Sequence, residues 1–222
     1  MEEKQKHPLF SSKEEEKVAY LYIVASIAAI DGSVSSDEIN NLIKLAEQVA
    51  ISSDGLGKII SAAKEPQSAP IKKYIAELRK SDLRYTLVAD MFFLGYADDK
   101  LTKEEVDEIN LISGQLNVKQ EQVEAIKKYA KAMVDQAKGK VKGKETLKNM
   151  GSDIASSLAA SGVPLGAVAV SGSVFGLSAA GMTSGLAALG LGFGMATGIG
   201  VVAAIGVASF MGVRWAIKKV NN

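Results

Sequence analysis

Sixty consecutive residues, from Ile154 to Val213, contain no Asp, Glu, Lys, Arg, His, Asn or Gln. A membrane crossing takes about 20 apolar residues, so this stretch is long enough for two crossings and, at the limit, three. Thirteen of the 21 glycines lie in it, together with many Ala and Ser residues, so it is only moderately apolar. We expect a glycine-rich helical hairpin, either inserted in a membrane or packed tightly inside a soluble fold.

Small residues recur at four-residue spacing along this stretch, and such spacing lets two helix backbones approach closely. Pro164 can open the first arm of the hairpin, and residues 181–185 form the natural reversal. We expect the seam to pack helix against helix within one chain or in a homo-oligomer. Its glycines are Gly172, Gly176, Gly181, Gly185, Gly190, Gly194 and Gly198.

Basic residues flank the uncharged stretch on both sides, as they do at the cytoplasmic edge of a membrane segment. This predicts attachment to the anionic inner leaflet, with both termini in the cytoplasm and an even number of crossings. Lysine clusters also bind nucleic acid, but the lysine cluster before the uncharged stretch, residues 127–148, has no arginine, and we expect no nucleic-acid partner. The predicted anchor residues are Lys138, Lys140, Lys142, Lys144, Lys148, Arg214, Trp215, Lys218 and Lys219.

The first part of the chain is net acidic, whereas the part that contains the uncharged stretch is net basic, and the sequence has few of the side chains that catalysis requires. Residues 1–126 hold 22 acidic and 15 basic side chains, whereas residues 127–222 hold 3 and 11. Cysteine is absent and His7 is the only histidine, so neither a Cys-His nor a Ser-His-Asp arrangement can form. The N-terminus carries no signal-peptide pattern. We therefore expect a cytoplasmic domain at the inner membrane that is not an enzyme.

The periodicity predicts an all-α chain. We expect a flexible tail (1–11), a helical domain (12–135), a basic linker (136–153), the apolar hairpin (154–213) and a basic, aromatic cap (214–222). Ser12 with Glu15, and Ser35 with Glu38, have the spacing of helix capping boxes.

The helical domain reads as a duplication. Shifting the chain by 67 residues aligns apolar positions and turn residues of one half with the other without a gap. Two helical units that each bury an apolar stripe against the other explain such a match. The aligned pairs include Asp31 with Asp98, Glu38 with Glu105, Leu42 with Ile109, and Ile51 with Val118.

Two acidic turns, residues 29–38 (Ala-Ile-Asp-Gly-Ser-Val-Ser-Ser-Asp-Glu) and 96–105 (Tyr-Ala-Asp-Asp-Lys-Leu-Thr-Lys-Glu-Glu), resemble the repeated signature of tellurite-resistance TerB-like domains. The resemblance covers about residues 12–135, and Ile30 and Asp99 depart from the pattern. It implies an all-helical fold with two pseudo-symmetric halves, signalling assemblies at the membrane, and a Ca²⁺ or Mg²⁺ site. That site would use Asp31, Glu38, Asp98 and Glu105.

Helix capping and turn formation explain the same four acids without any metal. Both interpretations stay open from the sequence.

The hairpin is similar to those of bacterial pore-forming toxins and antiphage defence effectors. We therefore expect a bacterial stress or defence protein, in which a TerB-like sensor or protein-interaction domain is joined to a membrane-inserting, pore-forming and oligomeric hairpin. One alternative is a passive membrane-anchored scaffold in tellurite or envelope stress. Another is a soluble metal-binding stress protein whose hairpin is buried.

Overall fold

A computed structural model gives the fold. It describes residues 8–28, 36–65, 68–97, 101–137, 140 and 144–168, and these are the residues discussed below. The described part is entirely helical, which confirms the predicted fold class. The glycine-rich hairpin lies outside the described residues from residue 169 onward and stays a prediction.

The helices follow one another with short connections. In chain order they are α1 (Pro8–Ser11), α2 (Glu14–Ala28), α3 (Ser36–Gln48), α4 (Ser53–Lys64), α5 (Ser68–Leu78), α6 (Leu83–Ala97), α7 (Lys103–Gln115), α8 (Gln120–Ala137), α9 (Lys144–Ser161) and α10 (Leu165–Val168).

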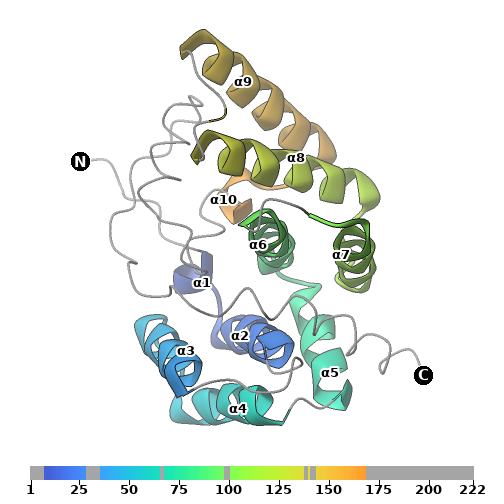
Figure 1. Cartoon of the computed structure of the whole chain (residues 1–222). Coiled ribbons are helices and arrows are strands. Elements are labelled where there is room, and N and C mark those ends of the chain that lie inside the picture. Colours follow the sequence, from blue (N-terminus) through green and yellow to red (C-terminus); the bar gives the residue numbers. More distant parts are fainter. Residues whose placement is uncertain are drawn as a thin grey trace.

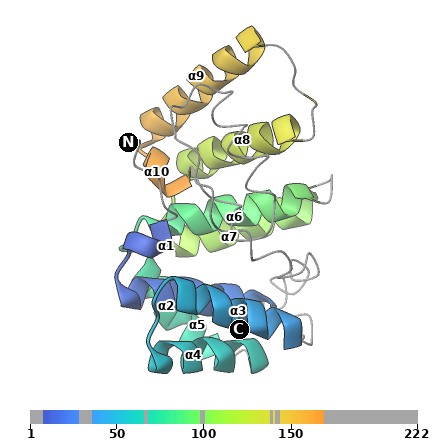
Figure 2. The ribbon, with the colours of Figure 1, turned by 90° about the vertical axis from the view of Figure 1, so that its left-hand side faces the viewer.

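Helices α2 and α6 form the centre of the domain. Residues 18–26 of α2 and residues 85–93 of α6 are all buried, because both segments are apolar on nearly every side. Helix α2 packs against α4 and α5, and α6 packs against α8. Figures 1 and 2 show the helices stacked in layers, with α2–α5 on one side of α6 and α8–α9 on the other.

Three helix starts have the capping-box spacing: one is confirmed, one is wrong, and the Ser35–Glu38 box stays a prediction because Ser35 lies outside the described residues. Thr102 and Glu105 form the capping box of α7: the Glu105 N–H donates to Thr102 Oγ1 at 3.2 Å, and the Thr102 N–H donates to Glu105 Oε2 at 2.7 Å. The predicted Ser12–Glu15 box is wrong, since the Lys13 N–H donates to Glu16 instead. Helix α2 begins at Glu14, so Lys13 takes the position before it, and the Ser12 hydroxyl instead donates to the carbonyl of Pro8, the first residue of α1.

Two corners of the fold share one backbone geometry at a spacing of 67 residues. Ala50 after α3 and Asn117 after α7 both have left-handed backbones, with φ of 56° and 61°. The N–H of the next residue, Ile51 or Val118, donates to a carbonyl five residues earlier at 2.9 Å in both corners. This is the Schellman helix ending. The two corners lie at the predicted offset, and the duplication itself stays a prediction.

Helix α9 starts inside the stretch that the sequence suggested as a basic linker and continues into the uncharged stretch. Ile154 and Leu158 on α9 are buried, as are Val163 and Val168 beyond it. Gly162, with φ of +73°, ends α9 with the same Schellman bonds and turns the chain into α10. Residues 154–168, the first quarter of the uncharged stretch, therefore belong to the helical domain and contribute side chains to its core.

Candidate functional site

Of the four predicted metal ligands, the structure describes both the backbone and the side chain only for Glu105. Glu105 is half-buried and accepts the Thr102 N–H in its capping box, so it has a structural role whether or not an ion binds. Glu38 lies in the first turn of α3, while Asp31 and Asp98 lie outside the described residues. No three His, Cys, Asp or Glu side chains within the described ranges come together to hold a metal.

Most of the predicted membrane and packing residues cannot be placed. Lys140 is exposed and its ammonium lies 3.8 Å from Asp135 Oδ1, while Lys144 and Lys148 lie on α9. None of the described helices is both long and apolar enough to cross a membrane. The remaining predicted anchor residues and the seven seam glycines lie outside the described residues. They are Lys138, Lys142, Arg214, Trp215, Lys218, Lys219, Gly172, Gly176, Gly181, Gly185, Gly190, Gly194 and Gly198.

A carboxylate lies in the centre of the core. Asp90 on α6 is fully buried, and the hydroxyl of Tyr20 on α2 donates a hydrogen bond to it. Burial raises the pKa of Tyr20 well above its usual value of 10.0, and the charge of Asp90 and their hydrogen bond raise it further. The pair links the two central helices by a buried hydrogen bond.

A second tyrosine lies close to this carboxylate. Tyr129 on α8 is 1% exposed, and its hydroxyl has no hydrogen-bond partner among the described residues. Burial, and after it the charge of Asp90, raise the pKa of Tyr129 above its usual range. The Tyr129 ring packs edge-on against Phe93 of α6, with ring centroids 5.9 Å apart. Packing rather than hydrogen bonding thus holds Tyr129 in place.

A polar joint attaches the end of α9 to the domain. Gln122 on α8 is 7% exposed, and its amide nitrogen donates to the Tyr85 hydroxyl and to the Ser161 carbonyl, both at 3.2 Å. Its amide oxygen accepts the Lys119 N–H at 3.0 Å. One buried side chain therefore fixes the start of α8, the end of α9 and the first turns of α6.

The joint extends to α10. Thr86, fully buried on α6, donates its hydroxyl to the carbonyl of Ala167 at 2.5 Å. Buried polar groups need partners, so undocking α10 would remove the Ala167 acceptor of the Thr86 hydroxyl, and undocking the end of α9 would remove the Ser161 acceptor of the Gln122 amide. The start of the uncharged stretch is thus held by specific hydrogen bonds as well as by apolar contact. Figure 2 shows α10 lying beside α6.

Sequence reasoning missed both features, although each had a signal. Asp90 is a lone carboxylate in the apolar run 87–95, and the 67-residue repeat places Ile23 at the corresponding position. In α9, Leu147, Ile154 and Leu158 recur at helical spacing and predict a buried face. The absence of charge after residue 153 favoured the interpretation as a membrane hairpin over a helix with one buried face.

The described chain is an all-helical domain with two helix corners of the same geometry, two central buried helices and a capped acidic turn. These features agree with the expected fold of tellurite-resistance domains. The chain belongs to the family of the tellurite resistance protein TerB, whose family model matches residues 17–128. No curated protein and no solved structure gives a significant match to this chain.

Proposed function

We propose that this chain is a non-enzymatic stress protein, in which the TerB domain binds a partner protein and the segment after residue 168 attaches the domain to the inner membrane. Membership of the TerB family indicates a stress function related to tellurite resistance. The membrane attachment, the oligomerisation of the glycine seam and any pore formation are our proposals. They rest on the sixty uncharged residues and their basic flanks.

The joint between the domain and the uncharged stretch carries this proposal. Residues 154–168 are uncharged yet folded into the domain, and residue 169 follows α10 directly. A force or rearrangement in the membrane segment would therefore act on α10 and, through Thr86 and Gln122, on the central helix α6. Such a connection suits a protein that transmits a signal between a membrane segment and an interaction domain.

A second candidate is the soluble stress protein with a buried hairpin, and the same joint favours it in one respect. Ile154, Leu158 and Val168 show that residues of the uncharged stretch can pack into a protein core. The remainder of the stretch, or a second copy of the chain, would then cover apolar surface in the same way. This candidate predicts that the full chain stays in solution without detergent.

Membrane fractionation distinguishes the two candidates. The full chain and a fragment ending at residue 168 are produced in bacteria, and the lysates are separated into membranes and supernatant, followed by an alkaline carbonate wash. We expect the full chain to stay with the membranes after the wash and the fragment to stay in the supernatant. A full chain that is soluble and monodisperse without detergent would favour the buried hairpin instead.

Replacing glycines of the seam distinguishes a passive anchor from an assembled hairpin. Gly190→Leu with Gly194→Leu increases the apolar character of the segment but separates packed backbones. We expect this variant to remain in the membrane fraction and to lose dye release from liposomes and any growth arrest on overexpression. Unchanged dye release and toxicity, or none in the wild-type chain, would support a passive anchor.

A further inference from the structure

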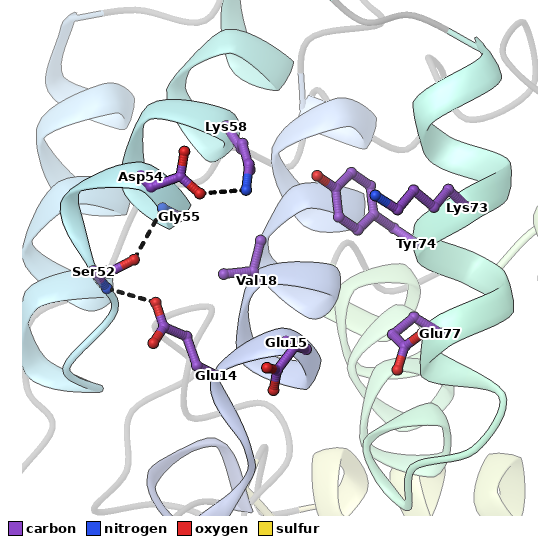
Figure 3. Close-up of a pocket in the computed structure, with 10 residues that line it drawn as sticks. All are labelled: Glu14, Glu15, Val18, Ser52, Asp54, Gly55, Lys58, Lys73, Tyr74 and Glu77. Atoms are coloured by element: carbon purple, nitrogen blue, oxygen red, sulfur yellow. Dashed lines mark hydrogen bonds and ion pairs between the residues drawn. The ribbon is translucent and has the colours of Figure 1, made fainter.

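A cavity lies between helices α2, α4 and α5, on the side of the domain away from α9. Its volume is about 340 Å³, which is within the range of small-molecule sites. The cavity exists because α4 packs very closely on α2 at Gly55, while α5 is held further along α2 by the contact between the rings of Tyr22 and Tyr74 (centroids 4.0 Å apart). Val18, the α2 residue of the close contact at Gly55, lines the middle of the cavity (Figure 3).

Charges of opposite sign gather at opposite ends of this cavity. Figure 3 shows Glu14, Glu15 and Glu77 at one end, and Lys58 and Lys73 at the other. The backbone register explains the separation. The Ser52 N–H donates to Glu14, so Ser52 marks the acidic end, and Lys58 lies six residues further along α4. At 1.5 Å per residue this is about 9 Å along α4, while Lys73 and Glu77, four residues apart on α5, are separated by about 6 Å along their helix.

Some of these charged side chains already have an ion-pair or hydrogen-bond partner, and others have no ion pair. Lys58 pairs with Asp54 on the same helix, which leaves this pair neutral. Glu14 accepts the Ser52 N–H at 3.0 Å through one oxygen, and its hydrogen bonds with Ser52 lower the pKa of Glu14. Glu15, Glu77 and Lys73 have no ion pair in the part of the chain that the structure describes. Two free carboxylates thus face one free ammonium across an apolar middle.

We propose that this cavity binds a short zwitterionic peptide in an extended conformation. Its ammonium or guanidinium group would lie between Glu15 and Glu77, its apolar stem on Val18 and the Tyr74 ring, and its carboxylate beside Lys73. A free metal ion would gain nothing from the apolar middle, and a polyanion would be repelled by the acidic end. Only a ligand with both charges, separated by about one helical turn, satisfies Lys73 and the acidic end together.

Calorimetric titration of the full chain with three peptides tests this proposal. The probe is N-acetyl-lysyl-alanyl-alanine, which has one cation and one carboxylate. Its norleucyl analogue lacks the cation, and its C-terminal amide lacks the carboxylate. We expect saturable binding of the probe and affinities about three- to fivefold weaker for each analogue, as for single exposed ion pairs.

Two variants identify the contacts. Glu77→Gln should weaken binding of the probe but leave the affinity for the norleucyl analogue unchanged. Lys73→Gln should weaken binding of the probe but leave the affinity for the C-terminal amide unchanged. Glu47→Gln and Lys44→Gln, at exposed positions of α3 outside the cavity, are the matched controls and should bind like wild type. Absence of saturable heat with all three peptides at millimolar concentration overturns the proposal. The proposal is also overturned if Lys73→Gln weakens binding of the probe and of its C-terminal amide by the same factor, because the effect would then not depend on the ligand carboxylate. Neither result bears on membrane attachment, which fractionation measures separately.

Discussion

At the scale of single residues, two buried tyrosines next to one carboxylate differ in what their hydroxyls do. The Tyr20 hydroxyl donates to Asp90, which has no access to water, whereas the Tyr129 hydroxyl is buried without a partner among the described residues. A buried acceptor that loses its donor costs free energy, and a buried donor without a partner is already a cost. The same Tyr→Phe change should therefore affect the free energy of unfolding differently at the two positions.

We expect Tyr20→Phe to lower the free energy of unfolding by about 1–3 kcal/mol, because it leaves the Asp90 carboxylate short of a donor in the core. Tyr129→Phe should be neutral or slightly stabilising, since it removes only an unsatisfied hydroxyl and keeps the ring against Phe93. Urea unfolding of both variants measures this difference. Equal destabilisation by the two changes would show that the Tyr129 hydroxyl has an unrecognised partner.

Glu105 allows the capping role and the proposed metal role to be separated. Glutamine serves in a capping box as well as glutamate does, so Glu105→Gln should leave the free energy of unfolding unchanged. Glu105→Ala should lower the free energy of unfolding by roughly 0.3–1.5 kcal/mol. If the proposed Ca²⁺ or Mg²⁺ site exists, Glu105→Gln should also reduce the heat of ion binding in calorimetry. Ion binding that is unchanged in both variants would place Glu105 outside the site.

At the scale of helices, α4 carries two glycines with opposite roles. A Cβ at Gly55 would lie 2.7 Å from Ile51 Cγ2 and 2.8 Å from Val18 Cγ2, whereas a Cβ at Gly57 would meet nothing within 4 Å. Both neighbours of Gly55 are β-branched side chains, which cannot easily rotate away. Gly55 therefore sets the distance between α4 and α2, and Gly57 only weakens its own helix.

We expect Gly55→Ala to destabilise the protein by about 1–2 kcal/mol through overpacking, and Gly57→Ala to stabilise it by about 0.5–1 kcal/mol through helix propensity. Chemical denaturation of the two variants in parallel tests both signs. A stabilising Gly55→Ala would mean that α4 can move away from α2 at little cost.

The sequence predicted helices best where local chemistry decides their ends. The capping box of Thr102 and Glu105 and the 67-residue spacing of the α3 and α7 starts were both readable, because each depends on neighbouring residues alone. The Ser12 box was wrong because α2 begins at Glu14, so that Lys13 and not Ser12 takes the N-cap position. Long-range partners could not be read: nothing local to Tyr20 indicates Asp90, and nothing local to Gln122 indicates Ser161.

At the scale of the whole molecule, the folding unit extends well beyond the residues that match the family. The match ends at residue 128, yet α9 and α10 bury Ile154, Leu158, Val163 and Val168 against the rest of the domain. Each such side chain contributes on the order of 1.5–3 kcal/mol when it is fully buried. A fragment that ends near residue 137 would therefore expose apolar faces of α6 and α8.

We expect a fragment of residues 1–168 to unfold cooperatively and a fragment of residues 1–137 to melt about 10 °C lower or to aggregate. Far-UV circular dichroism during heating, with size-exclusion chromatography before it, measures both properties. Equal melting temperatures for the two fragments would show that α9 and α10 rest on the domain without stabilising it.

The docking of α10 also fixes how much chain is left for a bilayer. With residues 154–168 held in the domain, the uncharged residues that remain run from 169 to 213, which is 45 residues. Two crossings at about 20 residues each take 40 of them and leave about five for the reversal, which then falls near residues 189–193 and not at residues 181–185. A third crossing no longer fits. A membrane-inserted chain would thus have a single tight turn on the far side, and its last nine residues would return to the side on which the TerB domain lies.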